Sequence, residues 1–272
     1  MRNLLKTDLK RIIKDKLFLI SCIIAGAYSV LSPVLYKVMF AMIGADDKML
    51  EAMGAAPSAK SMLFQALVPG GDLGLIIPIL IIIALCKDFS YGTIRNKIIA
   101  GHSRAKIFIS MFITSVIIMF SIMLAQALLS FFVSLALFSY SAQGFEASEI
   151  LYLIVSIVLE LIVYITVCSI ICFFCVFMKN PGTSVVMFFA VNFTVTMVGS
   201  IIMIASTMAT PGSTAASVLD VLYKSNIFIN PVIGAVDSYT FKDLLLVLVP
   251  NLIFAPLITF FGYKVFNKKD LK

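Results

Sequence analysis

The polar stretch KDFSYGTIRNKIIAGHSRAK, from Lys87 to Lys106, separates two long apolar segments and is the longest polar interval in the first half of the chain. Its basic side chains are Lys87, Arg95, Lys97, Arg104 and Lys106. Basic residues between apolar blocks are typical of a cytoplasmic connection between two membrane spans. The stretch therefore predicts a helical membrane protein with a short polar helix between two of its spans.

The composition of the whole chain predicts the same class. Of the 272 residues, 61% are hydrophobic and 13% are charged, and the mean hydropathy is +1.08. A soluble domain is about half apolar and about a quarter charged. The apolar residues also lie in blocks, several of them as long as the roughly 20 residues that a helix needs to cross a bilayer. We expect an all-α membrane protein that forms one transmembrane domain over residues 1–272.

Six segments are predicted to span the membrane, at residues 17–40, 72–86, 107–138, 149–178, 183–208 and 244–266. The second is short for a bilayer, so either it starts inside the membrane or it continues back through 62–68 with a break at Pro69. The intervals 41–71 and 209–243 are expected outside. The later interval contains two apolar stretches too short to cross, which favours re-entrant or interfacial helices.

The first 16 residues are expected to form an amphipathic helix in the membrane interface, because leucine and isoleucine side chains share one helical face opposite three lysines. With both chain ends inside the cell, 16 of the 21 Lys and Arg residues fall on the cytoplasmic side and five fall outside. Such an excess indicates orientation. The sequence thus predicts a multi-pass protein of the cell membrane with both termini in the cytoplasm.

Common catalytic and ligand-binding motifs do not occur in the sequence. It contains no G-x-x-x-x-G-K-[ST] phosphate loop, and the one histidine, His102, has no second His or Cys at metal-ligand spacing. The net charge of +7 comes from residues at the ends of apolar blocks, which indicates topology rather than a nucleic-acid surface. The five cysteines lie in apolar segments, where burial is expected. We therefore expect no catalytic site, no metal and no cofactor bound by this chain.

Residues 92–100 are long enough for about two and a half helical turns. Ile94, Ile98 and Ile99 are predicted to face one side of this helix. Gly101 can end it, and Ser103 can cap the next span. Such a helix would be joined to two spans at near-rigid corners and suits the transfer of motion from a soluble partner. The alternative is a solvated loop that only fixes the topology.

A specific motif runs through the same stretch: Asp88-Phe89, then Gly92-Thr93-Ile94-Arg95-Asn96-Lys97, then Gly101 and Ser103-Arg104. It resembles the first cytoplasmic loop of ABC-2-type transporter permeases, which commonly has an acidic residue, then G-T-[IL]-[RK], and later S-R. The six-span plan and the amphipathic N-terminus are also similar. Asp88 stands where those permeases commonly have Glu.

The resemblance implies a permease subunit that pairs with a second copy or a paralogue and binds two separate ABC ATPase subunits, which hold ATP and Mg. The helix over residues 92–100 would be the coupling helix in a groove of the ATPase, and the motif residues would make or support that contact. The N-terminal helix would pack beside it. By analogy, the substrate would be amphipathic, such as an antimicrobial or other peptide, while drugs, lipids and polysaccharides stay open.

Three polar residues inside the spans are candidates for a substrate path. Glu160 lies in the fourth span, where an ionised carboxylate costs a few kcal/mol. It either faces a polar cavity or a dimer interface, or forms a structural hydrogen bond. Asn192 and Thr196 lie in the fifth span, where such residues line a path or link helices.

Two other function classes remain open at this point. A secondary transporter or channel without an ATPase partner should show inverted repeats and several charges inside the membrane, and Glu160 is the main such charge. A membrane-embedded enzyme should show paired acids or histidines within its spans. The sequence favours the exporter subunit over both.

Overall fold

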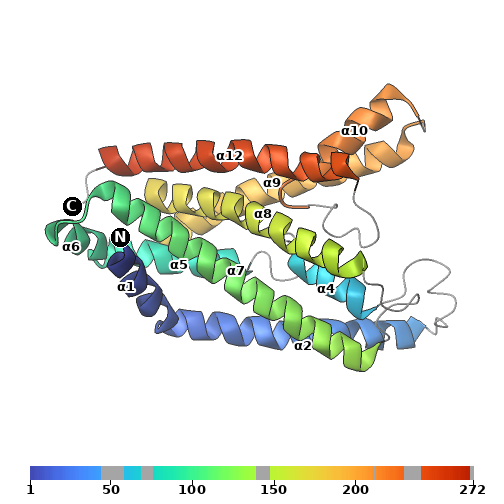
Figure 1. Cartoon of the computed structure of the whole chain (residues 1–272), viewed down its shortest axis with the longest axis horizontal. Helices are drawn as coiled ribbons and strands as arrows, with labels where there is room; N and C mark the ends of the chain where they lie inside the picture. Colours follow the sequence, from blue (N-terminus) through green and yellow to red (C-terminus); the bar gives the residue numbers. More distant parts are fainter. Residues whose placement is uncertain (44–57, 69–75, 139–147, 211, 230–239, 270–272) are drawn as a thin grey trace.

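The apolar blocks of the sequence form long helices that run along the length of the molecule (Figure 1). The computed structural model describes residues 1–43, 58–68, 76–138, 148–210, 212–229 and 240–269, and all regular structure within them is helical. Five of the described helices are long and apolar enough to cross a membrane: α2 (Lys16–Ile43), α7 (Arg104–Leu137), α8 (Ser148–Met178), α9 (Pro181–Met208) and α12 (Phe241–Lys268). At about 1.5 Å per residue, each exceeds the roughly 30 Å of a bilayer's hydrocarbon core.

Five shorter helices complete the described part of the chain: α1 (Arg2–Ile13), α4 (Ala59–Leu67), α5 (Ile76–Ser90), α6 (Thr93–Ile99) and α10 (Thr214–Lys224). Helices α1 and α6 lie at one end of the bundle, and α10 lies at the opposite end (Figure 1). Helices α5 and α6 together pass the same length and apolarity test but are bent by 55°. The described chain therefore holds five candidate spans, or six if the bent pair forms one.

Five of the six predicted spans match long helices within three residues at each described boundary. The predicted span 72–86 corresponds to α5, although residues 72–75 lie outside the described residues. With 15 residues, α5 is about 22 Å long and cannot cross a bilayer alone. The proposed extension through 62–68 is also helical, since it forms most of α4, and α4 is buried against α7. The predicted outside interval 41–71 thus includes a helix that belongs to the bundle.

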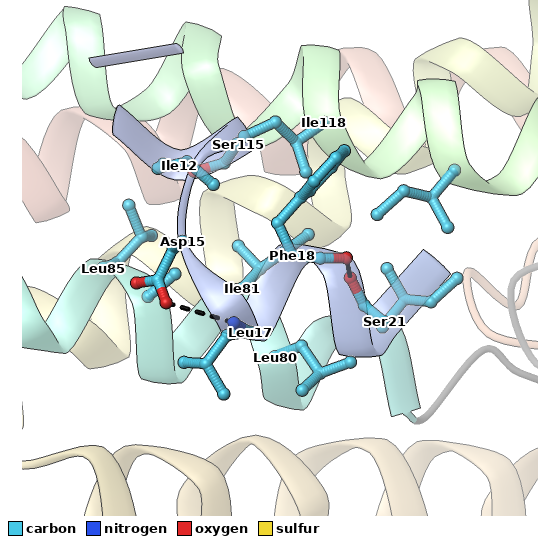
Figure 2. A pocket seen from close by; sticks show the side chains of 13 residues that line it. Ile12, Asp15, Leu17, Phe18, Ser21, Leu80, Ile81, Leu85, Ser115 and Ile118 are labelled. Atoms are coloured by element: carbon cyan, nitrogen blue, oxygen red, sulfur yellow. Dashed lines mark hydrogen bonds between the residues drawn. The ribbon is translucent and has the colours of Figure 1, made fainter. Parts of the chain in front are cut away.

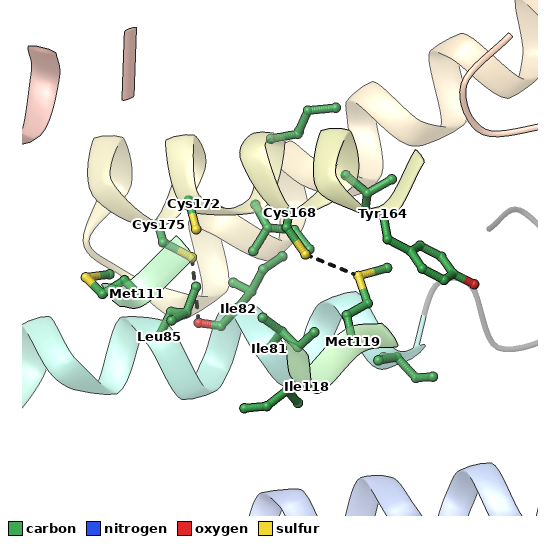
Figure 3. Packing of buried hydrophobic residues seen from close by; sticks show 14 of the residues in the cluster. Ile81, Ile82, Leu85, Met111, Ile118, Met119, Tyr164, Cys168, Cys172 and Cys175 are labelled. Carbon is green, nitrogen blue, oxygen red and sulfur yellow. Dashed lines mark hydrogen bonds between the residues drawn. The ribbon is translucent and has the colours of Figure 1, made fainter. Parts of the chain in front are cut away.

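The centre of the bundle is a row of small and aromatic side chains on α8 that faces α5 and α7 (Figure 3). Cys168 Sγ lies 3.6 Å from Met119 Sδ on α7, and Cys175 Sγ lies 3.8 Å from the Ile82 carbonyl oxygen on α5. Small side chains allow neighbouring helices to approach closely in a membrane. The expected burial of cysteines holds for this row, whereas Cys22 on α2 is exposed on the outside of the bundle.

Helix α9 contacts α10 and the turn after it through a glycine. Asn226 in that turn donates its side-chain amide to the Val195 carbonyl oxygen (3.0 Å) and accepts from the Phe228 N–H (3.0 Å) and the Ile229 N–H. A Cβ on Gly199 would lie 2.4 Å from the Asn226 amide nitrogen and 2.5 Å from Ile229 Cδ1. Since the Asn226 side chain is fixed by three hydrogen bonds, only glycine fits at position 199.

Replacing Gly199 with alanine is expected to lower the stability of the folded protein by about 1–3 kcal/mol, because the added methyl group overpacks this contact. The measurement is thermal unfolding of the detergent-solubilised chain. Gly26→Ala is the matched control, since nothing lies within 4 Å of a Cβ at Gly26 on α2. The control should be unchanged or stabilised. A Gly199→Ala chain as stable as the control would contradict the close contact.

Candidate functional site

Helix α6 is held between two glycines in left-handed backbone conformations, Gly92 (φ +66°) and Gly101 (φ +85°). Gly92 caps the start of α6 and accepts the Asn96 N–H (3.0 Å), which separates α6 from α5. At the other end the Gly101 N–H donates to the Ile98 carbonyl and the His102 N–H donates to the Lys97 carbonyl, the paired bonds of a glycine-terminated helix. Ser103 then caps α7 through the Lys106 N–H. The predicted roles of Gly101 and Ser103 in the local structure are confirmed.

The two faces of α6 differ from the prediction. Ile94 is buried and Ile98 is half-buried against the core, but Ile99 is 73% exposed. Conversely, the Lys97 side chain is only 10% exposed. The grouping of three isoleucines on one side was therefore wrong for Ile99. The physical reason is that Lys97 is drawn inward by two carboxylates, Asp88 on the preceding helix and Asp8, which lies 89 residues earlier in the sequence.

These carboxylates form a junction of four helices, which we call the ion-pair junction: Asp8 and Arg11 on α1, Asp88 on α5, Lys97 on α6 and Ser110 on α7. The Lys97 Nζ atom lies 2.7 Å from Asp8 Oδ1 and 3.5 Å from Asp88 Oδ2. Arg11 binds both carboxylate oxygens of Asp88, with Nη2 2.6 Å from Oδ2. Ser110 donates its hydroxyl to Asp8 Oδ2 (2.7 Å). Two buried acids are thus neutralised by two cations.

A second ion pair lies beside the junction, where α1 meets α2. The Lys87 Nζ atom is 2.9 Å from Asp15 Oδ2, and Asp15 also accepts the Leu17 N–H at 3.1 Å (Figure 2). Partial burial acts to raise the pKa of Asp15, but the Leu17 N–H and the Lys87 ammonium outweigh it and hold the pKa below its ordinary value. Because this pKa is lowered in the folded state, the pair stabilises the protein above about pH 4, and this contribution is lost as the pH falls further. Both side chains are partly exposed, so the contribution is below about 1 kcal/mol.

A cavity of 230 Å³ opens between these pairs. It is lined by Arg11, Ile12, Asp15, Ala84, Lys87, Asp88, Tyr91 and Thr93. Thr93 of the predicted motif therefore lies at the junction and not on the outer tip of α6. Among the described residues no group of three or more His, Cys, Asp or Glu side chains could hold a metal ion.

Two further motif residues, Arg104 and Phe89, contact the C-terminal end of α12 and do not belong to the outer surface of α6. Arg104 donates from Nη1 to the carbonyl oxygens of Asn267 (2.7 Å) and Lys269 (3.0 Å). Phe89 packs edge-on against Phe266 at a ring distance of 6.4 Å. The Lys269 ammonium donates in turn to the last carbonyls of α8, including that of Val176 at 3.0 Å. Burial and the nearby Lys179 charge lower the pKa of Lys269.

The outward surface of α6 is consequently small and mixed in character. Arg95 and Asn96 point away from the bundle, and Tyr91 and Ile99 are 75% and 73% exposed. Of the 11 motif residues, these observations place Arg95 and Asn96 outward, and Asp88, Ile94 and Lys97 inward. The motif prediction missed Asp8, Arg11 and Ser110. An aspartate within an otherwise basic amphipathic segment was the available signal for Asp8.

The three predicted substrate-path residues do not come together. Glu160 is fully buried on the face of α8 that carries Tyr164 and Cys168, and neither of its carboxylate oxygens has a hydrogen-bond partner within the described chain. Asn192 on α9 is also buried, with an unpartnered amide nitrogen. Thr196 is half-buried and accepts the Ser200 hydroxyl through its carbonyl at 3.0 Å. The structure gives these residues no shared cavity among the described pockets.

Replacing Lys97 with methionine should destabilise the folded chain by about 3–5 kcal/mol, since Asp8 and Asp88 would remain buried with one cation between them. Thermal unfolding in detergent is the measurement. Arg95→Met is the control, because Arg95 lies on the opposite, exposed face of α6. This change should alter stability by less than about 0.5 kcal/mol. Equal effects of the two changes would mean that the Lys97 charge is solvated and that the junction does not hold α6.

No curated protein matches this chain. A family model described as a protein of unknown function (DUF2705) matches residues 18–272, which include every described helix from the third residue of α2 onward. Because this match covers far more than half of its length, the chain belongs to the DUF2705 family.

Proposed function

We propose that this chain is the membrane-spanning subunit of an ATP-driven exporter of the ABC-2 type, with α6 as the helix that contacts a separate ATPase. The observation that carries the proposal is the way in which α6 is fixed to the rest of the bundle. This short helix lies at the end of the bundle, turns through 55° from α5, and is fixed by two left-handed glycines and by Lys97. A loop that only fixes topology needs none of these constraints.

The ion-pair junction supports a mechanical role for α6. Lys97 on α6 binds Asp8 on α1 and Asp88 on α5, and Asp8 binds Ser110 on α7. A displacement of α6 would therefore be passed to α1, α5 and α7 together rather than absorbed by a flexible loop. The exposed residues Tyr91, Arg95, Asn96 and Ile99 form the surface that would enter the ATPase groove.

The remaining parts of the proposal follow from the resemblance and the charge distribution. The end of the bundle that carries α1 and α6 would face the cytoplasm of a cell-membrane protein, with both termini on that side. Two ATPase copies would hold ATP and Mg there, which suits a chain without a phosphate loop. Large apolar side chains are exposed along α2, α9 and α12. They would face lipid and a second permease copy or paralogue.

The proposed cargo is an amphipathic molecule, such as an antimicrobial or other peptide, moved outward. This part rests on family analogy. The alternative function is a secondary transporter or channel without an ATPase. It would use Glu160 and would leave the outer surface of α6 without a partner, so the two functions differ in a binding experiment.

The test is co-expression and co-purification of the chain with any ABC ATPase whose gene lies next to its own, followed by titration of binding and of transport-linked ATP hydrolysis. Arg95→Glu reverses a charge on the outer surface of α6 and should weaken ATPase binding at least about tenfold, about 1.4 kcal/mol. Lys242→Glu, an exposed charge at the opposite end of the bundle, is the matched control and should bind normally. Unaltered binding and hydrolysis by the Arg95→Glu chain would contradict the assignment of α6. Failure to isolate any ATPase with the chain would favour the alternative.

A further inference from the structure

Glu160 has an environment that the exporter function does not require. Its side chain is completely buried in α8, and both carboxylate oxygens lack a hydrogen-bond donor within the described residues. Tyr164, one turn further along, donates its hydroxyl to the Leu67 carbonyl at 2.9 Å. Buried polar groups nearly always have partners, so an orphaned carboxylate inside a bundle needs an explanation.

The packing register places a second acceptor without a hydrogen-bond partner at the level of Glu160. Helices α7 and α8 run antiparallel, with Phe120 against Tyr164 (ring distance 6.4 Å) and Met119 against Cys168. Extending this pairing by about two turns brings Gln126 of α7 level with Glu160. Gln126 is buried as well, and its Oε1 atom has no donor. The same level of the bundle thus contains three buried acceptor oxygens that have no hydrogen-bond partner among the described residues.

A proton bound to the Glu160 carboxylate supplies a hydrogen-bond donor at this level without any other change in the structure. As a neutral acid, Glu160 carries an O–H group that can donate to Gln126 Oε1, which pairs two of the three orphaned oxygens. Protonation also removes the cost of a buried charge. We propose that Glu160 is a proton-binding site of this protein, with Gln126 as the acceptor of the bound proton.

A row of buried polar side chains shows from which side the proton would come. Ser130 and Ser134 follow Gln126 on the same face of α7, at successive helical turns, and Ser156 lies one turn before Glu160 on α8. All lie between Glu160 and the end of the bundle opposite α6. In the other direction, the neighbouring layers of α7 are apolar: Ile118, Met119, Ile122 and Met123. The site would therefore exchange its proton with the side of the membrane opposite α6.

Other charged and titratable groups do not compete for this role. Between Lys106 and its last residue, α7 has none, and α9 has none at all. On α8, Tyr164 and Cys168 are uncharged neighbours, Tyr152 lies about two turns before Glu160, and Glu149 lies in the first turn of the helix. On α5 the titratable groups lie at the α6 end of the helix: Cys86, Lys87 and Asp88. On α12 they lie in the first turn and the last two turns: Lys242, Asp243, Tyr263, Lys264 and Lys268. Lys60 on α4 takes part in other interactions and makes no hydrogen bond to either oxygen of Glu160.

The first test follows stability against pH in the full-length chain in detergent. If the native protein keeps the Glu160 proton while the unfolded chain releases it above about pH 4.3, the native state binds one more proton, and raising the pH favours unfolding. The unfolding equilibrium constant should then rise by an extra factor of about ten per pH unit, and Glu160→Gln should abolish this extra slope. Thr114→Val, which alters an unpartnered hydroxyl in the other half of α7, should keep it. Parallel pH curves for wild type and Glu160→Gln would overturn the proposal.

A second measurement does not depend on the stability of the variant. Infrared difference spectra of the wild-type chain in H2O and D2O should contain the carbonyl band of a protonated carboxylic acid, which Glu160→Gln removes and Gln126→Leu shifts. A third measurement compares the thermal unfolding temperature in sodium, potassium and choline chloride at equal ionic strength, which tests whether an alkali ion binds instead of a proton. Stabilisation by one alkali ion that is lost in Glu160→Gln, without the infrared band, would mean that a metal cation occupies the site and would refute the proton. ATPase binding by Glu160→Gln should be unchanged, which separates this proposal from the exporter function.

Discussion

The interaction on which the α6 end of the bundle depends is the placement of one ammonium group, that of Lys97, between two buried carboxylates. Without it, Asp8 and Asp88 would repel each other across the contact between α1 and α5. With it, a helix of seven residues, too short to be stable alone, becomes a fixed part of the bundle. Each charge also has a further partner, Arg11 for Asp88 and Ser110 for Asp8, which meets the requirement that buried ions be paired and hydrogen-bonded.

The two ends of α7 are therefore polar for different reasons. At the α6 end its Ser110 belongs to a charge-balanced network that ties four helices. Towards the opposite end, Gln126, Ser130 and Ser134 accompany a buried carboxylate whose oxygens have no hydrogen-bond partner among the described residues. Apolar layers around Met119 and Met123 separate the two polar regions. A single helix thus contacts a charge-balanced polar site at one end and, towards the other end, the site where we propose that a proton binds.

Sequence reasoning succeeded where local chemistry decides the outcome. The long helices follow from block hydropathy, the end of α6 follows from the backbone freedom of Gly101, and the start of α7 follows from the capping side chain of Ser103. It failed at Lys97 and Ile99, because their orientations depend on Asp8, which is 89 residues away in the sequence. The burial of α4 was missed for the same reason: nine residues of moderate hydropathy do not show that α7 will cover them. Glu160 could be found from sequence as a charge within a span, but the lack of a partner is a property of the packing.

The long sequence separation within the ion-pair junction also affects how the protein is made. Asp8 leaves the ribosome early, whereas Ser110 follows 102 residues later. At a synthesis rate of about 5–20 residues per second, Asp8 waits roughly 5–20 s before this partner exists. During that time its charge must be solvated by water or lipid headgroups, which is possible only at the surface of the membrane. A carboxylate that is buried in the finished protein is therefore placed at the one depth where the unfinished chain can tolerate it.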